Sequence, residues 1–228
     1  MLYVTSLSPE NDATQFGIER ELMVATQLRA RGISDEGVLT SMARVPRHVF
    51  VAEECRDQAY EDHPVPIGDG QTISQPYIVA IMLQALALTG SEKVLEVGTG
   101  SGYQTALLAE LAVEIYSVER HASLAAAAER KLAALGYRNV HVLVGDGSQG
   151  LPEYPPFDAI VVSAAAPIIP PALFEQLAEN GRMVIPVGPA HAQELQLVRK
   201  QNGEATVKVL EGCRFVPLIG GQGYPDEW

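Results

Sequence analysis

Residues 94–111, VLEVGTGSGYQTALLAEL, constrain the fold of this chain more than any other stretch. A short apolar run ends in an acid, three glycines follow at alternate positions (Gly98, Gly100 and Gly102), and helical spacing then begins. Glycines permit a tight turn and let a ligand approach the backbone, and the first turn of the next helix presents free N–H groups. The stretch therefore predicts a strand–loop–helix unit that cradles a small molecule. The alternative is a glycine-rich turn without a ligand.

The same alternation of strands and helices continues to the end of the chain. Short apolar strands are expected at 93–97, 113–119, 140–146, 157–163 and 181–188, with helices at 103–111, 122–135 and 171–180. Residues 194–212 read as a hairpin with its turn at 201–203. This order predicts an α/β fold, a doubly wound, mostly parallel, Rossmann-like sheet with an antiparallel edge hairpin.

The N-terminal part has a different pattern. Helical spacing covers 16–31, a short helix starts at Asp35 and runs towards 43–51, and another helix covers 77–88. Residues 52–76 are rich in Gly, Pro and acids, which predicts a long irregular segment of functional importance. We expect a single domain: a helical cap with an active-site loop (1–92), the core (93–219) and a tail (220–228). The tail, which contains Trp228, is either a mobile flap near the substrate or a disordered end.

Composition narrows the class of partner. The 228 residues carry a formal net charge of −12, which disfavours nucleic acid as a partner. No apolar run reaches the ~20 residues of a membrane span, and the N-terminus lacks the features of a secretory signal. Cys55 and Cys213 are predicted to be free, buried thiols, and the five histidines show no metal spacing. A cytoplasmic monomer without a metal or a membrane contact is expected.

Acids at three strand ends indicate the ligand. Glu119 stands 21 positions after Gly98, where an acid can accept both hydroxyls of a ribose. NAD fits poorly, because Tyr103 stands where the dinucleotide fingerprint needs Gly or Ala and because Glu96 would repel a pyrophosphate. S-adenosyl-L-methionine, with an ammonium and a sulfonium, fits better. Asp146 could accept the exocyclic amine of adenine or simply close its strand in an Asx-turn.

The acceptor must be inferred from the loops. A carboxylate acceptor is already ionised at neutral pH, so it needs aim and loss of water but no general base. Ser74 offers a hydroxyl that could aim it, although an N-cap for the helix starting at Pro76 is the alternative. Residues 163–167 lack the Asn/Asp-Pro-Pro-aromatic clamp used on nucleic-acid amines, and neither cysteine follows a proline as cytosine C5 chemistry requires.

Seven blocks occur in order along the chain: GDGQTISQPY, VLEVGTGSGYQTALLA, SVER, GDGSQG, FDAIVVSAAAP, GRMVIPVG and RFVPL. Together they resemble the protein-L-isoaspartate O-methyltransferase family, and within it the bacterial branch. The resemblance implies transfer of a methyl group from S-adenosyl-L-methionine to the free α-carboxyl of L-isoaspartyl residues. S-adenosyl-L-homocysteine is the other product, and the acceptors are damaged proteins and peptides that the reaction begins to repair.

The resemblance also implies roles for individual residues. Ser74 matches the active-site serine. Cofactor contacts are expected from Thr72, Ile73, Glu96, Gly98, Gly100, Ser101, Gly102, Glu119, Asp146 and Gly147. Substrate contacts are expected from Ser74, Tyr77, Ala164, Ala165, Ala166 and Val216, with Tyr77 standing where many members have His. Independently of the resemblance, Arg47 is expected to be a structural salt-bridge partner and not a contact for the substrate. Two alternatives stay open: a methyltransferase for a small carboxylic acid or another protein group, and a module that keeps the fold without the chemistry.

Overall fold

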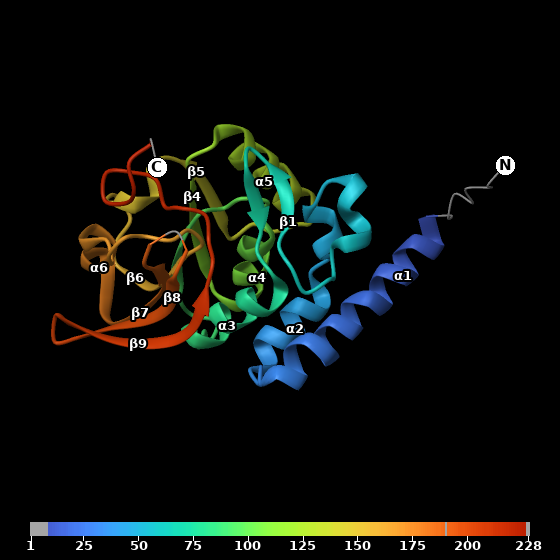
Figure 1. Cartoon of the computed structure of the whole chain (residues 1–228), viewed down its shortest axis with the longest axis horizontal. Coiled ribbons are helices and arrows are strands. Elements are labelled where there is room, and N and C mark those ends of the chain that lie inside the picture. Colours follow the sequence, from blue (N-terminus) through green and yellow to red (C-terminus); the bar gives the residue numbers. More distant parts are fainter. Residues whose placement is uncertain (1–8, 190, 227–228) are drawn as a thin grey trace.

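The computed structural model describes residues 9–189 and 191–226. Its core is a seven-stranded sheet with the strand order β5-β4-β3-β6-β7-β8-β9 (Figure 1). The neighbours from β5 to β7 are parallel, and β8 and β9 are antiparallel. The strands are β3 (Lys93–Val97), β4 (Glu114–Glu119), β5 (Val140–Val144), β6 (Phe157–Val162), β7 (Leu177–Val187), β8 (Gln193–Gln201) and β9 (Glu204–Cys213). The predicted fold class is confirmed, including the edge hairpin, whose turn has positive φ at Asn202 and Gly203.

The strand order creates a crevice at the carboxyl ends of the two central strands, β3 and β6. From β3 the chain builds outward through β4 and β5, and β6 then returns to the other side of β3. In such open sheets, ligands bind at the carboxyl ends of the strands where the order reverses. The backbone N–H of Ser163, just after β6, donates to the carbonyl of Val97 at 2.8 Å and ties the two strand ends together. The switch point therefore lies at the glycine loop.

Both faces of the sheet are covered. Successive residues of a strand point to opposite faces, and here Val94 and Ala159 join one apolar cluster while Leu95 and Ile160 join another. The first cluster includes residues of α3 and α4 and of the N-terminal cap, and the second includes residues of α6. The helices of the core are α3 (Pro76–Leu86), α4 (Tyr103–Leu111), α5 (Ala122–Ala134) and α6 (Pro171–Gln176).

The N-terminal cap is helical, as predicted. α1 (Pro9–Leu22) continues as a π-helical turn η1 (Met23–Leu28) and a 3₁₀ turn η2 (Arg29–Arg31). Figure 1 shows α1 reaching away from the sheet, with α2 (Glu36–Arg44) beside it. Asp35 caps α2 by accepting a hydrogen bond from the N–H of Val38 at 3.0 Å. Within the described ranges, no helix combines the length and the apolar character needed to cross a membrane.

Two predictions about secondary structure and one about burial are wrong. Residues 52–76 are not irregular throughout, because 3₁₀ turn η4 (Glu53–Gln58) and a small antiparallel sheet of β1 (Val65–Gly68) and β2 (Gln71–Ile73) form there. These strands are too short for periodicity to reveal. Helix α6 ends at Gln176, well before residue 180, because Leu177 already pairs with Phe157 in the sheet. Cys55 and Cys213 are free as predicted, but only partly buried.

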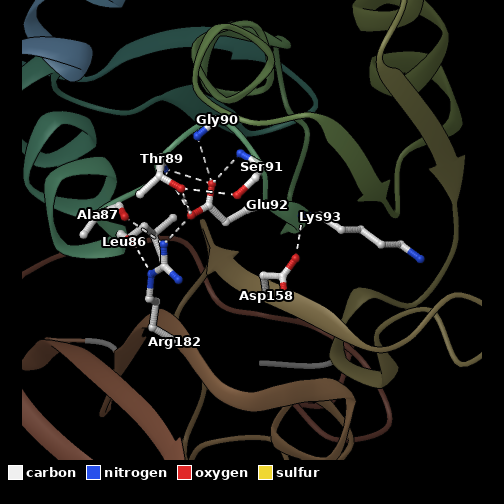
Figure 2. Close-up of polar contacts among 9 residues, drawn as sticks. All are labelled: Leu86, Ala87, Thr89, Gly90, Ser91, Glu92, Lys93, Asp158 and Arg182. Carbon is white, nitrogen blue, oxygen red and sulfur yellow. Dashed lines mark hydrogen bonds and ion pairs between the residues drawn. The ribbon is translucent and has the colours of Figure 1, made fainter.

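A carboxylate network joins the end of α3 to the sheet (Figure 2). Glu92 accepts hydrogen bonds from the backbone N–H groups of Thr89 (2.9 Å to Oε2), Gly90 (3.1 Å) and Ser91 (3.1 Å), and from Arg182 Nη2 (2.9 Å). Arg182 also donates to the carbonyl oxygens of Leu86 and Ala87, where α3 ends. Burial alone would raise the pKa of Glu92, but the hydrogen bonds from Thr89 and Arg182 outweigh it and lower the pKa to about 2.

The lowered pKa of Glu92 predicts acid sensitivity. The stabilisation is complete above the unfolded pKa of 4.5 and is lost as pH falls through the folded pKa of about 2. At about 1.4 kcal/mol per pKa unit, the change in the free energy of unfolding is up to about 3 kcal/mol. Urea unfolding of Glu92→Gln at pH 7 and pH 3 should show this part of the acid sensitivity gone. Glu129→Gln, at an exposed position on α5, should keep it, and equal acid sensitivity in all three proteins would contradict the account.

Candidate functional site

The glycine loop has the conformation that its sequence requires. Gly98 has φ +95° and Gly100 has φ +52°, values that residues with side chains rarely adopt. The N–H of Gly98 donates to the carbonyl of Val118 at 2.8 Å, which ties the loop to β4. A Cβ on Gly98 would lie 3.4 Å from Ser163 Cβ, so the loop passes close under the end of β6. The backbone itself thus forms one wall of the crevice.

A cavity of about 400 Å³ lies over this loop. Its walls come from the loop, the ends of β4 and β6, the strand β2 and the C-terminal segment that follows β9. Ten predicted site residues line it: Thr72, Ile73, Ser74, Gly98, Gly100, Ser101, Glu119, Gly147, Ala164 and Val216. Segments far apart in the sequence thus meet at one place.

Glu119, the last residue of β4, lies next to the glycine loop. Its Oε2 accepts the N–H of Gly100 at 2.9 Å, and its Oε1 accepts the N–H of His121 at 3.0 Å. The side chain is buried, yet it lines the cavity. Each carboxylate oxygen has lone pairs for a second donor, so the group is fixed in place and can still accept hydroxyls from a ligand.

Glu96, on β3, does not line the cavity. It is fully buried, and its Oε2 accepts hydrogen bonds from the hydroxyls of Ser117 (2.6 Å) and Thr105. Burial raises its pKa to about 7, against the opposing effect of these hydrogen bonds. Its Oε1 has no partner among the described residues. Glu96 therefore links β3 to α4 and β4.

Asp146 is covered by the tail of the chain. Its Oδ1 accepts the N–H of Ser148 at 2.9 Å, which is the predicted Asx-turn, and its Oδ2 accepts the N–H of Gly221 at 2.8 Å. Burial opposes its ionisation, but the hydrogen bonds from Gly221 and Ser148 outweigh burial and lower the pKa. A Cβ on Gly220 would clash with Asp146 Oδ1, so a side chain there would displace the carboxylate. An adenine contact at Asp146 stays a prediction.

The tail therefore lies against the site as far as the structure describes it. Ile219 and Asp226 line the cavity, and Asp226 pairs with Arg120 at 2.7 Å. Trp228 falls outside the described residues, and mobility of the tail stays a prediction.

Ser74 stands where the cavity meets a second one. The second cavity, of about 390 Å³, shares five residues with the first: Thr72, Ser74, Ser163, Val216 and Pro217. The N-cap position of α3 belongs to Gln75, and no side chain caps the helix. Within the described part of the chain, the Ser74 hydroxyl has no hydrogen bond that would occupy it. The N-cap interpretation of Ser74 is wrong, and its hydroxyl is available at the junction.

Four further residues predicted for the site line neither cavity. Tyr77 does not line either cavity, because its ring stacks against the guanidinium of Arg31, 3.4 Å from the ring centroid. Ala165 and Ala166 are fully buried and act through their backbones; the N–H of Ala165 donates to the carbonyl of Val216 at 2.8 Å and thereby holds the C-terminal segment in place. Gly102 precedes α4 and packs against Ala128 of α5.

Several wall residues were missed from sequence. The first cavity also has Asp69, Gln104 and Arg120 in its lining, and the second has Ile78 and Arg214. Arg120 directly follows Glu119, the acid that ends a strand, and Arg214 begins the block RFVPL. Their closeness to these motifs could have identified them as site residues.

A family model described as protein-L-isoaspartate(D-aspartate) O-methyltransferase matches residues 19–223. The chain belongs to the protein-L-isoaspartate O-methyltransferase family. Its relatives include the protein-L-isoaspartate O-methyltransferases of Koribacter versatilis, 58% identical over 93% of this chain and 96% of the relative, and of Syntrophus aciditrophicus, 56% identical over 92% and 98%. The predicted family is confirmed.

Solved structures support the same assignment of family and fold. A protein-L-isoaspartate O-methyltransferase superposes with a TM-score of 0.81 at 29% identity, covering 90% of this chain and 67% of that one. A Plasmodium falciparum structure, described as a protein-L-isoaspartate O-methyltransferase in complex with S-adenosyl-L-homocysteine, has a TM-score of 0.77 at 28% identity and covers 88% and 98%.

Proposed function

We propose that this chain is a protein-L-isoaspartate(D-aspartate) O-methyltransferase that transfers a methyl group from S-adenosyl-L-methionine to the free α-carboxyl of L-isoaspartyl residues. The observation that carries this assignment is the junction of two cavities at Ser74. A cofactor in the first cavity and a peptide in the second would meet there. The methyl ester that forms would begin the repair of deamidated or isomerised proteins.

The first cavity suits S-adenosyl-L-methionine. Glu119 offers a fixed carboxylate that can accept ribose hydroxyls, and the backbone of the glycine loop can approach a ligand closely. Thr72, Ile73, Ser101 and Gly147 complete the walls that would hold it. When bound, the cofactor supplies a methyl group on a sulfonium, which an ionised carboxylate can take without further activation.

The residues of the chain then aim and desolvate the acceptor. The Ser74 hydroxyl can donate a hydrogen bond to one oxygen of the carboxylate and leave the other directed into the first cavity. No proton has to be removed, because the carboxylate is ionised at neutral pH. Val216 and Pro217, which line both cavities, would exclude water from the junction. Catalysis would thus rest on orientation and loss of water.

The working unit and its surroundings are also part of the proposal. The cap and active-site loop (1–92), the core (93–219) and the tail (220–228) act as one methyltransferase domain, since each contributes to a cavity wall or to its support. The enzyme works as a monomer in the cytoplasm on isoaspartyl proteins and peptides, and it uses neither nucleic acid nor a membrane as partner.

An acceptor panel tests the proposed function. The enzyme is incubated with methyl-labelled S-adenosyl-L-methionine and one of three acceptors: a peptide with L-isoaspartate, the same peptide with normal aspartate, or succinate. We expect label in the first alone, because only that peptide carries the free α-carboxyl of an L-isoaspartyl residue. Label in succinate would favour the small-acid alternative. No transfer to any acceptor, despite cofactor binding, would favour a module without the chemistry.

A further inference from the structure

We propose that Arg47 is a positioning residue for methyl transfer, which fixes Ser74 relative to the cofactor loop. The inference rests on the proposed function, since it concerns how the same junction is held. Arg47 belongs to the 3₁₀ turn η3 (Arg47–Phe50) in the cap, far from Ser74 in sequence. The predicted salt bridge of Arg47 is wrong for the side chains that the structure describes.

The guanidinium of Arg47 bridges two loops through their backbones. Nε donates to the carbonyl of Ala59 at 2.6 Å, and Nη2 donates to the carbonyl of Ser74 at 2.8 Å. The side chain is 0% exposed, so these bonds are shielded from water. The planar guanidinium holds its donors in fixed directions. It therefore restrains the backbone of Ser74 directly, one residue before the N-cap of α3.

The guanidinium also contacts the ring of Tyr103. It lies 4.8 Å from the centroid of the Tyr103 ring. Tyr103 is the first residue of α4, directly after Gly102, and it lines the first cavity. Arg47 thus contacts both the residue that would aim the acceptor and the helix that starts at the cofactor loop.

The energetic cost of Arg47 indicates a role beyond packing. Among the side chains that the structure describes, none of the ion pairs includes Arg47, and its Nη1 has no hydrogen-bond partner. Burial lowers its pKa to about 10, so the group stays charged at neutral pH. A buried charge without a counter-charge is costly, and replacing buried ions with apolar residues is often neutral or stabilising. An apolar residue at this position would avoid the cost of burying a charge. It could not, however, donate the hydrogen bonds that Arg47 makes to the carbonyls of Ala59 and Ser74.

A double-mutant cycle on methyl transfer tests the proposal. Arg47→Lys keeps a charge but lacks the planar fork. If Arg47 acts through Ser74, Arg47→Lys should lower kcat for an isoaspartyl peptide by about 10-fold in the wild type but by less than about 2-fold in Ser74→Ala, because coupled residues are not additive. In Arg47→Lys, the Kd for S-adenosyl-L-homocysteine should change by less than about 3-fold. The change acts through Ser74, whereas the ribose of the cofactor is assigned to Glu119.

Arg182→Lys is the matched control. Arg182 also donates to two backbone carbonyls, of Leu86 and Ala87, but it contacts neither cavity. Arg182→Lys should lower the midpoint of thermal unfolding. It should change kcat by the same factor in the wild type and in Ser74→Ala. Equal losses for Arg47→Lys in both backgrounds, or a variant that does not fold, would show a merely structural role and overturn the proposal.

Hydrogen exchange separates this proposal from the proposed function. If the wild type methylates no isoaspartyl peptide, the proposed function fails, while the Arg47 contact can still be examined. Faster amide exchange of residues 71–75 in Arg47→Lys, without faster exchange in Arg182→Lys, would support the positioning role. Unchanged exchange at 71–75 would overturn it.

Discussion

Ser74→Ala is expected to lower kcat/KM for an isoaspartyl peptide by about 10- to 100-fold, the value of one hydrogen bond to a charged group of 1.5–3 kcal/mol. The hydroxyl lies at the junction of the two cavities, and within the described residues nothing else occupies it. Without it, the carboxylate would still enter but would no longer be aimed at the methyl group. Initial rates of label transfer over a range of peptide concentrations give this value.

Two controls define the meaning of that result. Ser34→Ala removes an exposed serine hydroxyl of the cap outside both cavities, and it should leave kcat/KM unchanged. The Kd for S-adenosyl-L-homocysteine should stay near the wild-type value in Ser74→Ala. A collapse of cofactor affinity in that variant would mean that Ser74 supports the fold of the first cavity and does not aim the acceptor.

Glu119→Ala is expected to raise the Kd for S-adenosyl-L-homocysteine by about 10- to 100-fold, because charge-assisted hydrogen bonds to the ligand are lost. The same change leaves the N–H groups of Gly100 and His121 without their acceptor, which loosens the glycine loop. Calorimetric titration measures the Kd directly and does not depend on knowing the acceptor.

Glu114→Ala is the matched control for Glu119. Both acids belong to β4, but Glu114 stands at the opposite end of the strand, where it contacts Tyr116 and His141. The control should bind S-adenosyl-L-homocysteine like the wild type. Equal Kd values for Glu119→Ala and the wild type would contradict the cofactor position proposed for the first cavity.

The core of the fold could be predicted because its signals are local. Strand–helix alternation fixed the elements of the parallel sheet, and the spacing from Gly98 to Glu119 indicated a loop and an acid at the same edge. These residues lie at adjacent strand ends, so their neighbourhood follows from topology alone. The turn at Asn202 and Gly203 was equally predictable, since this pair favours positive φ in a hairpin.

Other features depend on tertiary contacts that no local pattern reveals. The tail covers Asp146 through the N–H of Gly221, 75 positions along the chain. Tyr77 follows the serine block in sequence, yet it turns to Arg31 on the cap. Arg47 was predicted to be a structural salt-bridge partner, but it donates hydrogen bonds to two backbone carbonyls in the interior. In each case the role of the residue depends on a contact with a residue distant in the sequence.

The most direct test of the account is a crystal structure with S-adenosyl-L-homocysteine and an L-isoaspartyl peptide bound together. The account predicts that the cofactor product fills the first cavity with its ribose at Glu119, that the peptide lies in the second, and that its α-carboxylate accepts a hydrogen bond from Ser74 Oγ. A peptide bound elsewhere, or an α-carboxylate directed away from Ser74 with the cofactor product in place, would contradict it.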